Sequence, residues 1–384
     1  MEIKGSVPFS GAVAIYDEVT AGRRRWLRVD ELCAAAALAA PGRLPDAAAL
    51  AAEARRPLRD KTGIERALGA FLHQVLADPV AGRHLCHAML LPQPGAVALL
   101  PRLEREGRLE FTGARLERAG RVSVVTMCNP PHLNAEDETT LGGFEQAIDL
   151  ALLDPVTELC VLRGAPVAQP KYAGRRLFGA GINLTHLWQG RIPYLWYLLR
   201  DLGPVNKLYR GLALPDADPE ASSIEKPWLA VVDGFAIGGH CQLLLVMDQV
   251  LAADDAWLSL PARKEGIIPG AANLRLPRHV GPRLARQAIL AGRRIDCASP
   301  AGQLVCDYVV PAAQLDLELE RLVGLLTGSG LVSAAANRRA LRIGEEPLDR
   351  FRRYMAVYAR EQADCHLSPA LVANLGRHWP AAQR

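Results

Sequence analysis

Two glycine-rich turns carry the clearest chemical signal in the sequence. The first reads RRLFGAGINL (175–184), and the second, further along the chain, reads GFAIGGHCQLLL (234–245). Each turn abuts an apolar segment and precedes a helical one, so backbone N–H groups at the helix start are free to donate. Two such groups that converge on one carbonyl oxygen stabilise an enolate or a tetrahedral oxyanion, and losing one donor typically costs about 2.7–4 kcal/mol of barrier. A single glycine turn mostly serves packing, but the pair predicts an oxyanion hole.

The helix after the second turn lacks the acid that acid–base chemistry would use. Gln242 stands at this helix start, and an amide forms hydrogen bonds without titrating. The question is therefore which reaction keeps the donors and omits the carboxylate.

Two charged residues call for an explanation, an acid at a helix start and an arginine in an apolar segment. Glu136 begins a helical segment after LNA, where an acid is also a routine partner of the helix dipole. Arg200 lies in the otherwise apolar segment YLWYLLRDLG, and an arginine on an apolar helix needs a partner. Its neighbour Asp201 is expected to point elsewhere on the helix, which favours a role for Arg200 in recognition of a ligand.

The elements that must position these residues fall into three regions. Residues 1–118 are rich in Ala, Leu and Arg and predict a helical N-terminal domain, with a first strand at 108–113. Residues 119–310 alternate apolar strands and helices, which favours α/β architecture. Residues 311–384 are helical again and are expected to contribute oligomer contacts and a cover for the active site. The predicted helices are 29–40, 45–58, 63–79, 135–155, 283–292, 315–326 and 348–365, and the predicted strands are 121–130, 158–166, 226–236 and a pair within 249–261.

Composition excludes several function classes. The 384 residues carry 45 Lys+Arg against 41 Asp+Glu in short runs only, so nucleic-acid binding is not expected. No secretory pattern or 18-residue apolar stretch occurs, which predicts no membrane segment and a cytoplasmic protein. The eight cysteines have no paired close spacing and read as small buried hydrophobes in a reducing compartment, with no metal site. The chain has neither a P-loop nor a G-x-G-x-x-G fingerprint, so ATP and NAD are not expected.

The motifs together resemble the crotonase (enoyl-CoA hydratase/isomerase) superfamily over residues 120–310. FGAGINL, GFAIGGHCQ and EGIIPGAANLRLPRHVG carry the resemblance. It implies a spiral of ββα turns, homotrimers or hexamers made of two trimers, and an acyl-CoA thioester whose carbonyl lies between the N–H groups of Ile182 and Gly239. It also implies that the loop 170–184 holds coenzyme A, with Lys171, Arg175 and Arg176 as phosphate partners, although an ordinary solvated charge cluster explains any one of them equally well. The other residues expected to contact substrate or coenzyme A are Tyr172, Ala180, Gly181, Asn183, Leu184, Gly238, His240 and Pro261. His240 replaces a glycine common in the superfamily and is not expected to be the base.

The sequence departs from the hydratases of this superfamily at both of their glutamates. Gln242 and Ala262 occupy those places, and because hydration needs both acids to deliver water and a proton, hydration is excluded. Glu265 lies three residues after Ala262, and a structural role is expected for it.

One branch of the superfamily is similar over essentially the whole chain, through LNAEDETTL, YLWYLLRDLG, GFAIGGHCQ and KEGIIPGAANLRL. This similarity implies a dioxygenase without metal or flavin, which oxidises (3,5-dihydroxyphenyl)acetyl-CoA to the arylglyoxylate and releases CoA, for the dihydroxyphenylglycine of glycopeptide antibiotics. It further implies that Glu136, Arg200 and Gln242 surround the substrate. Ile267 and Ile268 are candidates to line an apolar pocket for O₂, although core packing explains them at least as well.

Two alternatives stay open. The same fold and enolate can end in thioester hydrolysis or isomerisation, for which Glu136 is the one obvious carboxylate. A non-catalytic acyl-CoA-binding subunit would also lack the glutamates, but decay should have loosened the glycine turns, and both are intact.

Overall fold

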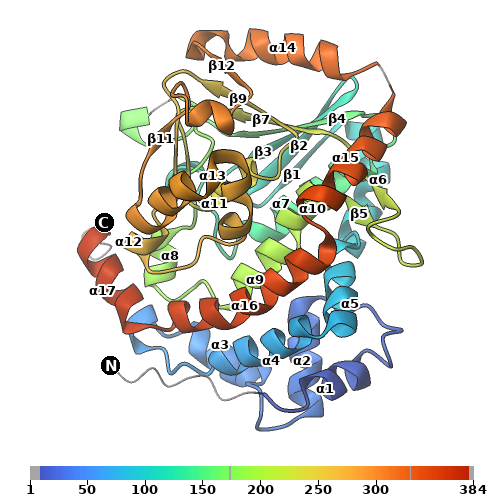
Figure 1. The fold of residues 1–384 in the computed structure, drawn as a ribbon, viewed down its shortest axis with the longest axis vertical. Coiled ribbons are helices and arrows are strands. Elements are labelled where there is room, and N and C mark those ends of the chain that lie inside the picture. Colours follow the sequence, from blue (N-terminus) through green and yellow to red (C-terminus); the bar gives the residue numbers. More distant parts are fainter. Residues whose placement is uncertain (1–8, 173, 329, 380–384) are drawn as a thin grey trace.

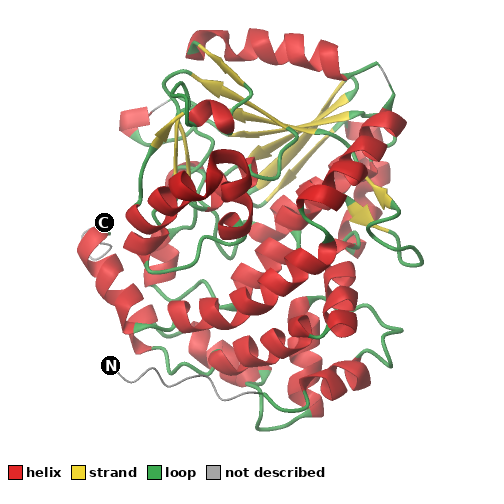
Figure 2. Ribbon diagram, viewed as in Figure 1, coloured by secondary structure: helices red, strands yellow, loops and turns green. Residues whose placement is uncertain are grey.

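A computed structural model describes residues 9–172, 174–328 and 330–379. Helices at the bottom of Figure 1, from the first third of the chain, lie below a strand-containing body (Figures 1 and 2). Helix α16 (Leu348–His366), near the C-terminus, crosses between the two parts and packs most extensively against α4 (Arg66–Ala77). No helix of the described residues is long and apolar enough to span a membrane.

The N-terminal part is built of helices with apolar faces turned toward one another. The predicted helices at 29–40, 45–58 and 63–79 are present as α2, α3 and α4, while α1, α5 and α6 were not predicted. The bounds are α1 Ala12–Val19, α2 Val29–Ala39, α3 Ala47–Ala54, α5 Pro79–Leu90 and α6 Pro94–Glu106.

A seven-stranded mixed sheet forms the core of the upper body, in the order β1-β2-β3-β4-β7-β9-β12. Strands β1 to β3 pair antiparallel, and β3 to β12 pair parallel in that order. The strands predicted at 108–113, 121–130, 158–166 and 226–236 and the first of the pair within 249–261 are present in this sheet, whereas β2 and β12 were not predicted. The bounds are β1 Arg108–Phe111, β2 Ala114–Ala119, β3 Val122–Met127, β4 Leu159–Gly164, β7 Trp228–Val232, β9 Gln249–Ala253 and β12 Tyr308–Val310. Helix α7 (Leu141–Leu153) packs against β2 and β3, and α14 (Leu315–Leu326) packs against β9.

A second sheet, of three strands in the order β11-β10-β8, carries the second glycine turn. Strand β8 (Phe235–Ile237) runs parallel to β10 (Trp257–Ser259), and β11 (Ile295–Asp296) closes the sheet. The pair of strands predicted within 249–261 is therefore present but divided between two sheets. A two-stranded ribbon joins β5 (Leu212–Ala213) and β6 (Ser223–Ile224).

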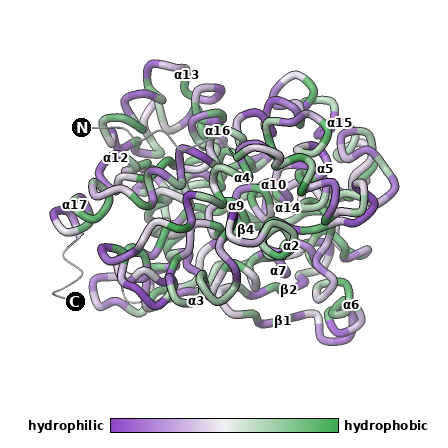
Figure 3. Tube along the Cα trace, turned by 90° about the horizontal axis from the view of Figure 1, so that it is seen from below, coloured by the Kyte–Doolittle hydropathy of each residue, from purple (hydrophilic) through white to green (hydrophobic). Residues whose placement is uncertain are grey.

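The remaining helices surround the two sheets. They are α8 Leu184–Trp188, α9 Leu195–Leu202, α10 Pro204–Arg210, α11 Gly239–Leu244, α12 Ala262–Glu265, α13 Ala272–Ala291 with a kink at Gly281, α15 Leu331–Glu345 and α17 Pro369–His378. Seen from below, α4, α9 and α16 lie near the middle of the molecule (Figure 3).

Two large hydrophobic clusters hold the fold together. One surrounds the seven-stranded sheet and contains Trp228 and Leu229 of β7. The other contains apolar residues of α1, α2, α4, α5, α9, α16 and α17, from Phe9 to Leu375. The second cluster thus joins helices from both ends of the chain.

Candidate active site

The two glycine turns meet, as the sequence predicts. Gly181 has φ +80° and Gly238 has φ +53°, conformations in which a side chain would be strained. A Cβ placed on Gly181 would lie 3.3 Å from the backbone nitrogen of Gly239. The backbones approach so closely that glycine is required at this contact.

The hydrogen bonds around the turns leave one N–H group free on each. Glu136 N donates to Gly181 O (2.7 Å) and Asn183 N donates to Glu136 O (2.7 Å), so the backbone N–H of Ile182, between these bonds, has no acceptor among the described residues. On the second turn Gly238 N donates to Ser259 O (2.8 Å), while the N–H of Gly239, the first residue of α11, has no acceptor among them either. These are the two donors that an oxyanion hole needs.

Arg200 binds three parts of the site with one guanidinium. Its Nε donates to Glu136 Oε1 (2.9 Å), Nη1 to Gln242 Oε1 (2.9 Å) and Nη2 to Gly239 O (2.8 Å). Asp201 also lies near Nη1, at 3.4 Å, so the expectation that Asp201 points away is wrong: the end of α9 turns both side chains toward α11. The buried charge is balanced, and the start of α11 is fixed to α9.

Gln242 is oriented by this arginine. Because its Oε1 accepts from Arg200, its amide nitrogen is the end left to donate elsewhere. Gln242 lines the cavity between α9, α11 and α12. It therefore offers a hydrogen-bond donor at the position where hydratases of the superfamily that this sequence resembles carry an acid.

His240 fastens the first turn to the second. Its Nδ1 accepts the backbone N–H of Gly181 at 2.9 Å, which places the proton of the neutral ring on Nε2. Burial lowers the pKa of His240 to about 4, against the opposing effect of Glu136. The ring is therefore neutral at neutral pH and holds Gly181 beside Ile182.

The cavity at these turns is narrow, with a volume of about 30 Å³. The predicted site residues that line it are Ile182, Arg200, Gly238, Gly239, Gln242, Ile267 and Ile268. Glu136 and His240 instead line a smaller adjoining cavity, together with Cys128 and Phe144.

Several residues of the main cavity escaped the sequence interpretation. Trp196 and Tyr197 share the face of α9 that carries Arg200, a spacing visible in YLWYLLRDLG. Tyr358 comes from α16, and nothing in its local sequence indicates a site. Glu265 also lines the cavity.

The loop expected to hold coenzyme A packs over β8 and β10. Tyr172 contacts Phe235 edge to face at 5.9 Å between ring centroids, and Lys171 Nζ lies 5.1 Å from the Tyr172 ring. Arg175 is paired with Asp255, and Arg176 donates to Gly164 O at 3.4 Å. Lys171 is thus the one basic residue of the three with no salt bridge or hydrogen bond among the described residues.

The remaining predicted contacts serve the turns themselves. Asn183 caps α8 through His186 N (3.2 Å), and Leu184 is the first residue of that helix. Ala180 N donates to Leu133 O (3.1 Å), and Pro261 directly precedes α12. Their contact with substrate stays a prediction.

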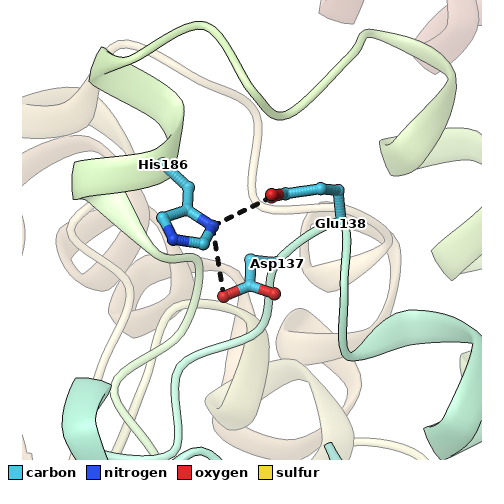
Figure 4. Close-up of side chains that lie close together, drawn as sticks. All are labelled: Asp137, Glu138 and His186. Carbon is cyan, nitrogen blue, oxygen red and sulfur yellow. Dashed lines mark hydrogen bonds and ion pairs between the residues drawn. The ribbon is translucent and has the colours of Figure 1, made fainter. Parts of the chain in front are cut away.

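Asp137, Glu138 and His186 lie close enough together to be tested as metal ligands (Figure 4). Both oxygens of Asp137 already accept hydrogen bonds, from Thr139, Asn129 and Asn183. Arg191 contacts Glu138 at 2.7 Å and His186 Nε2 at 3.0 Å, and its positive charge would oppose a cation. The cluster fits a hydrogen-bonded network that holds the Glu136 segment against Asn183, next to Ile182.

Comparison with known proteins adds three findings. A family model described as enoyl-CoA hydratase/isomerase matches residues 117–343. A (3,5-dihydroxyphenyl)acetyl-CoA 1,2-dioxygenase of Amycolatopsis orientalis is 50% identical over 353 residues, covering 92% of this chain and 80% of that protein. A carnitinyl-CoA dehydratase of Escherichia coli (strain K12) is 28% identical over 242 residues, covering 62% of this chain and 84% of that protein.

Solved structures with this fold include two bacterial proteins. An enoyl-CoA hydratase from Mycobacterium avium subsp. paratuberculosis K-10 has a TM-score of 0.58 at 22% identity, covering 70% of this chain and 99% of that one. An enoyl-CoA hydratase/isomerase from Xanthobacter autotrophicus Py2 has a TM-score of 0.58 at 24% identity, covering 71% of this chain and 96% of that one. At these identities the likeness concerns the fold, which is the predicted α/β fold.

Proposed function

Because the chain belongs to the enoyl-CoA hydratase/isomerase family, we propose that it acts on an acyl-CoA thioester, as a dioxygenase of (3,5-dihydroxyphenyl)acetyl-CoA. The observation that carries this proposal is the 50% identity, over 92% of the chain, to a relative that bears that name. The cavity supports it, since the oxyanion donors of Ile182 and Gly239 are kept while positions 242 and 262 hold Gln and Ala.

The proposed reaction combines the arylacetyl thioester with O₂ to give the arylglyoxylic acid and CoA thiol. Loss of one α-proton gives an enolate, which is favoured because the ring and the thioester share its charge. The enolate reduces O₂ and forms a peroxide at the α-carbon. The peroxide attacks the thioester carbonyl and expels CoA, and cleavage of the O–O bond with loss of the second α-hydrogen gives the ketone and the carboxylate.

The residues of the cavity divide this work. The N–H groups of Ile182 and Gly239 hold the carbonyl oxygen as it becomes anionic. The amide of Gln242 donates a hydrogen bond without supplying a proton. Arg200 keeps Glu136, Gln242 and α11 in place. Glu136, which Arg200 holds and which lines the adjoining cavity, is the residue that we propose for recognition of the ring hydroxyls.

The proposal includes neither metal nor flavin. O₂ is the co-substrate, an electron-rich enolate can pass an electron to it directly, and CoA enters as part of the substrate. Lys171 is the residue we assign to the CoA phosphates. The arylglyoxylate would serve dihydroxyphenylglycine synthesis for vancomycin-type glycopeptide antibiotics, in the cytoplasm. We propose a homotrimer or a dimer of trimers, which light scattering coupled to gel filtration would measure.

The decisive experiment follows O₂ and free thiol together. Protein treated with chelator, and assayed for residual metal and flavin, is mixed with (3,5-dihydroxyphenyl)acetyl-CoA. Loss of one O₂ for each CoA released is the expected result. CoA release without O₂ loss would instead make the protein a thioesterase, and absence of both signals would contradict catalysis on this substrate.

A further inference from the structure

Glu265 faces the same cavity as the oxyanion donors. It is the last residue of the short helix α12, and Ala262, the first, also lines the cavity. Residues three apart on a helix share a face. The carboxyl group that is absent at position 262 is therefore present one helical turn later.

No structural contact accounts for this side chain. Among the described residues, the carboxylate of Glu265 forms neither a hydrogen bond nor an ion pair, whereas Glu136 and Asp201 both lie against Arg200. The structural role expected from the sequence is therefore not supported. Burial raises the pKa of Glu265 to about 7. Glu265 is half-buried at the cavity, and carboxyls with a shifted pKa in such a position concentrate at functional sites.

The other titratable groups of the cavity are unsuited to accept a proton. Burial raises the pKa values of Tyr197 and Tyr358 above the ordinary range, so both are neutral phenols at neutral pH. Arg200 is a cation, and Asp201, although burial raises its pKa, lies 3.4 Å from that cation, which opposes the rise. Glu136 points both oxygens at Arg200, with Nε–Oε1 and Nη2–Oε2 distances of 2.9 Å. Glu265 is the acceptor that remains among the described residues lining the cavity.

We propose that Glu265 accepts the α-proton of the bound thioester. This inference rests on the proposed function. The α C–H bond breaks, the proton passes to a carboxylate oxygen of Glu265, and the electron pair moves onto the carbonyl oxygen between the N–H groups of Ile182 and Gly239. The step is a proton transfer alone, and O₂ reacts after it.

Deuterium exchange under anaerobic conditions isolates this step. The full-length protein is incubated with (3,5-dihydroxyphenyl)acetyl-CoA in D₂O without O₂, and deuterium at the α-carbon is followed by mass spectrometry. Oxygen uptake is measured separately in air. Wild-type protein should exchange the α-hydrogens, and Glu265→Gln should reduce both exchange and O₂ uptake about 100-fold or more, as for a general base.

Glu104→Gln is the matched control, because Glu104 is exposed on α6 and should keep both rates. Exchange or O₂ uptake at the wild-type rate in Glu265→Gln overturns the inference while the proposed function stands. A wild-type protein that neither exchanges nor takes up O₂ contradicts the proposed function itself.

A second variant separates chemistry from packing. Glu265→Ala removes the carboxyl and leaves space for a small acid, so added formate should restore exchange in a concentration-dependent way. Formate should have no effect on wild type or on Glu265→Gln, whose side chain fills the space. An unrescued Glu265→Ala that is folded and binds substrate with unchanged affinity would also overturn the assignment.

Discussion

At the scale of single residues, Arg200 is the group whose shape matters most. Its planar fork reaches Glu136, Gln242 and the carbonyl of Gly239 at once. A lysine keeps the charge but offers one compact ammonium, so it cannot bind all three.

Arg200→Lys should therefore lower the rate of O₂ uptake about 100-fold, because the start of α11 loses its anchor and the donors shift. Steady-state oxygen electrode measurements would show this, with Arg102→Lys, an exposed residue on α6, as the control. A rate within twofold of wild type would mean that α11 is held by other contacts.

The variant Gln242→Glu tests why position 242 carries an amide and not a carboxylate. The new carboxylate would lie beside Arg200 and the developing enolate, and like charges should slow oxygenation about tenfold to 100-fold. Parallel assays of O₂ and thiol would show whether CoA release continues by hydrolysis. Equal O₂ uptake in both proteins would remove Gln242 from the mechanism.

Glu265 also predicts a pH dependence of stability. Burial raises its pKa to about 7 from 4.5, so between these values the native protein binds the proton more tightly than the unfolded chain. Its contribution to stability therefore falls as pH rises through this window. Glu265→Gln lacks this loss and should become more stable than wild type, by roughly 3 kcal/mol at most above pH 7. Denaturation of both proteins from pH 5 to 8 would measure the difference, and parallel curves would contradict it.

At the scale of elements, the most extensive packing joins α4 to α16. A Cβ on Gly69 would lie 2.5 Å from the Cβ of Ala363 and 3.1 Å from Ala359 O. Gly69→Ala should therefore cost about 1–3 kcal/mol through overpacking, despite the better helix propensity of alanine.

Thermal unfolding would measure this cost, and Ala363→Gly should recover part of it in the double variant, since it removes the nearer atom. Gly142→Ala in α7 is the control, because nothing lies within 4 Å of a Cβ at that position. A Gly69→Ala protein as stable as this control would show that α4 and α16 can move apart freely.

Much of the element pattern was predictable because periodicity is local. The helix predicted at 315–326 has the observed bounds of α14, and the strands around the glycine turns were found from apolar runs between turns. Helix α5 was missed although Asp78 caps it and Pro79 begins it; its glycine and histidines obscure the apolar face. Cap signals would have found it.

The parts of the site that could be predicted are those that a local sequence feature marks. Glycines that must adopt positive φ identified both turns, and an isolated arginine in an apolar helix identified Arg200. Tyr358 could not be found, because it reaches the cavity through tertiary packing of α16. Whether the side chain of Glu265 points into the cavity depends on whether α12 extends as far as residue 265, and the sequence alone did not define where this helix ends.

At the scale of the whole molecule, the cavity depends on a hydrophobic cluster drawn from both ends of the chain. Leu72 of α4 is fully buried in it, while Val161 of β4 belongs to the cluster around the sheet. Leu72→Ala should cost about 2–5 kcal/mol and should speed amide exchange in α9 and α16 as well as α4, because these helices open together.

Hydrogen–deuterium exchange mass spectrometry would map this effect. Val161→Ala is the counterpart and should loosen β3, β4 and β7 instead. Equal loosening of both regions by either variant would mean that the two clusters unfold as one unit.

The cluster that runs from Phe9 to Leu375 has a consequence for synthesis on the ribosome. The strands and glycine turns emerge while α16 is still being translated. The nascent chain therefore contains its oxyanion donors before α16, which contributes Tyr358 to the cavity, is present. The helices that emerge first must wait, with their apolar faces uncovered, for the helices that emerge last. A chaperone that covers those early helices would therefore act until α16 has emerged from the ribosome, and catalysis would begin only after that.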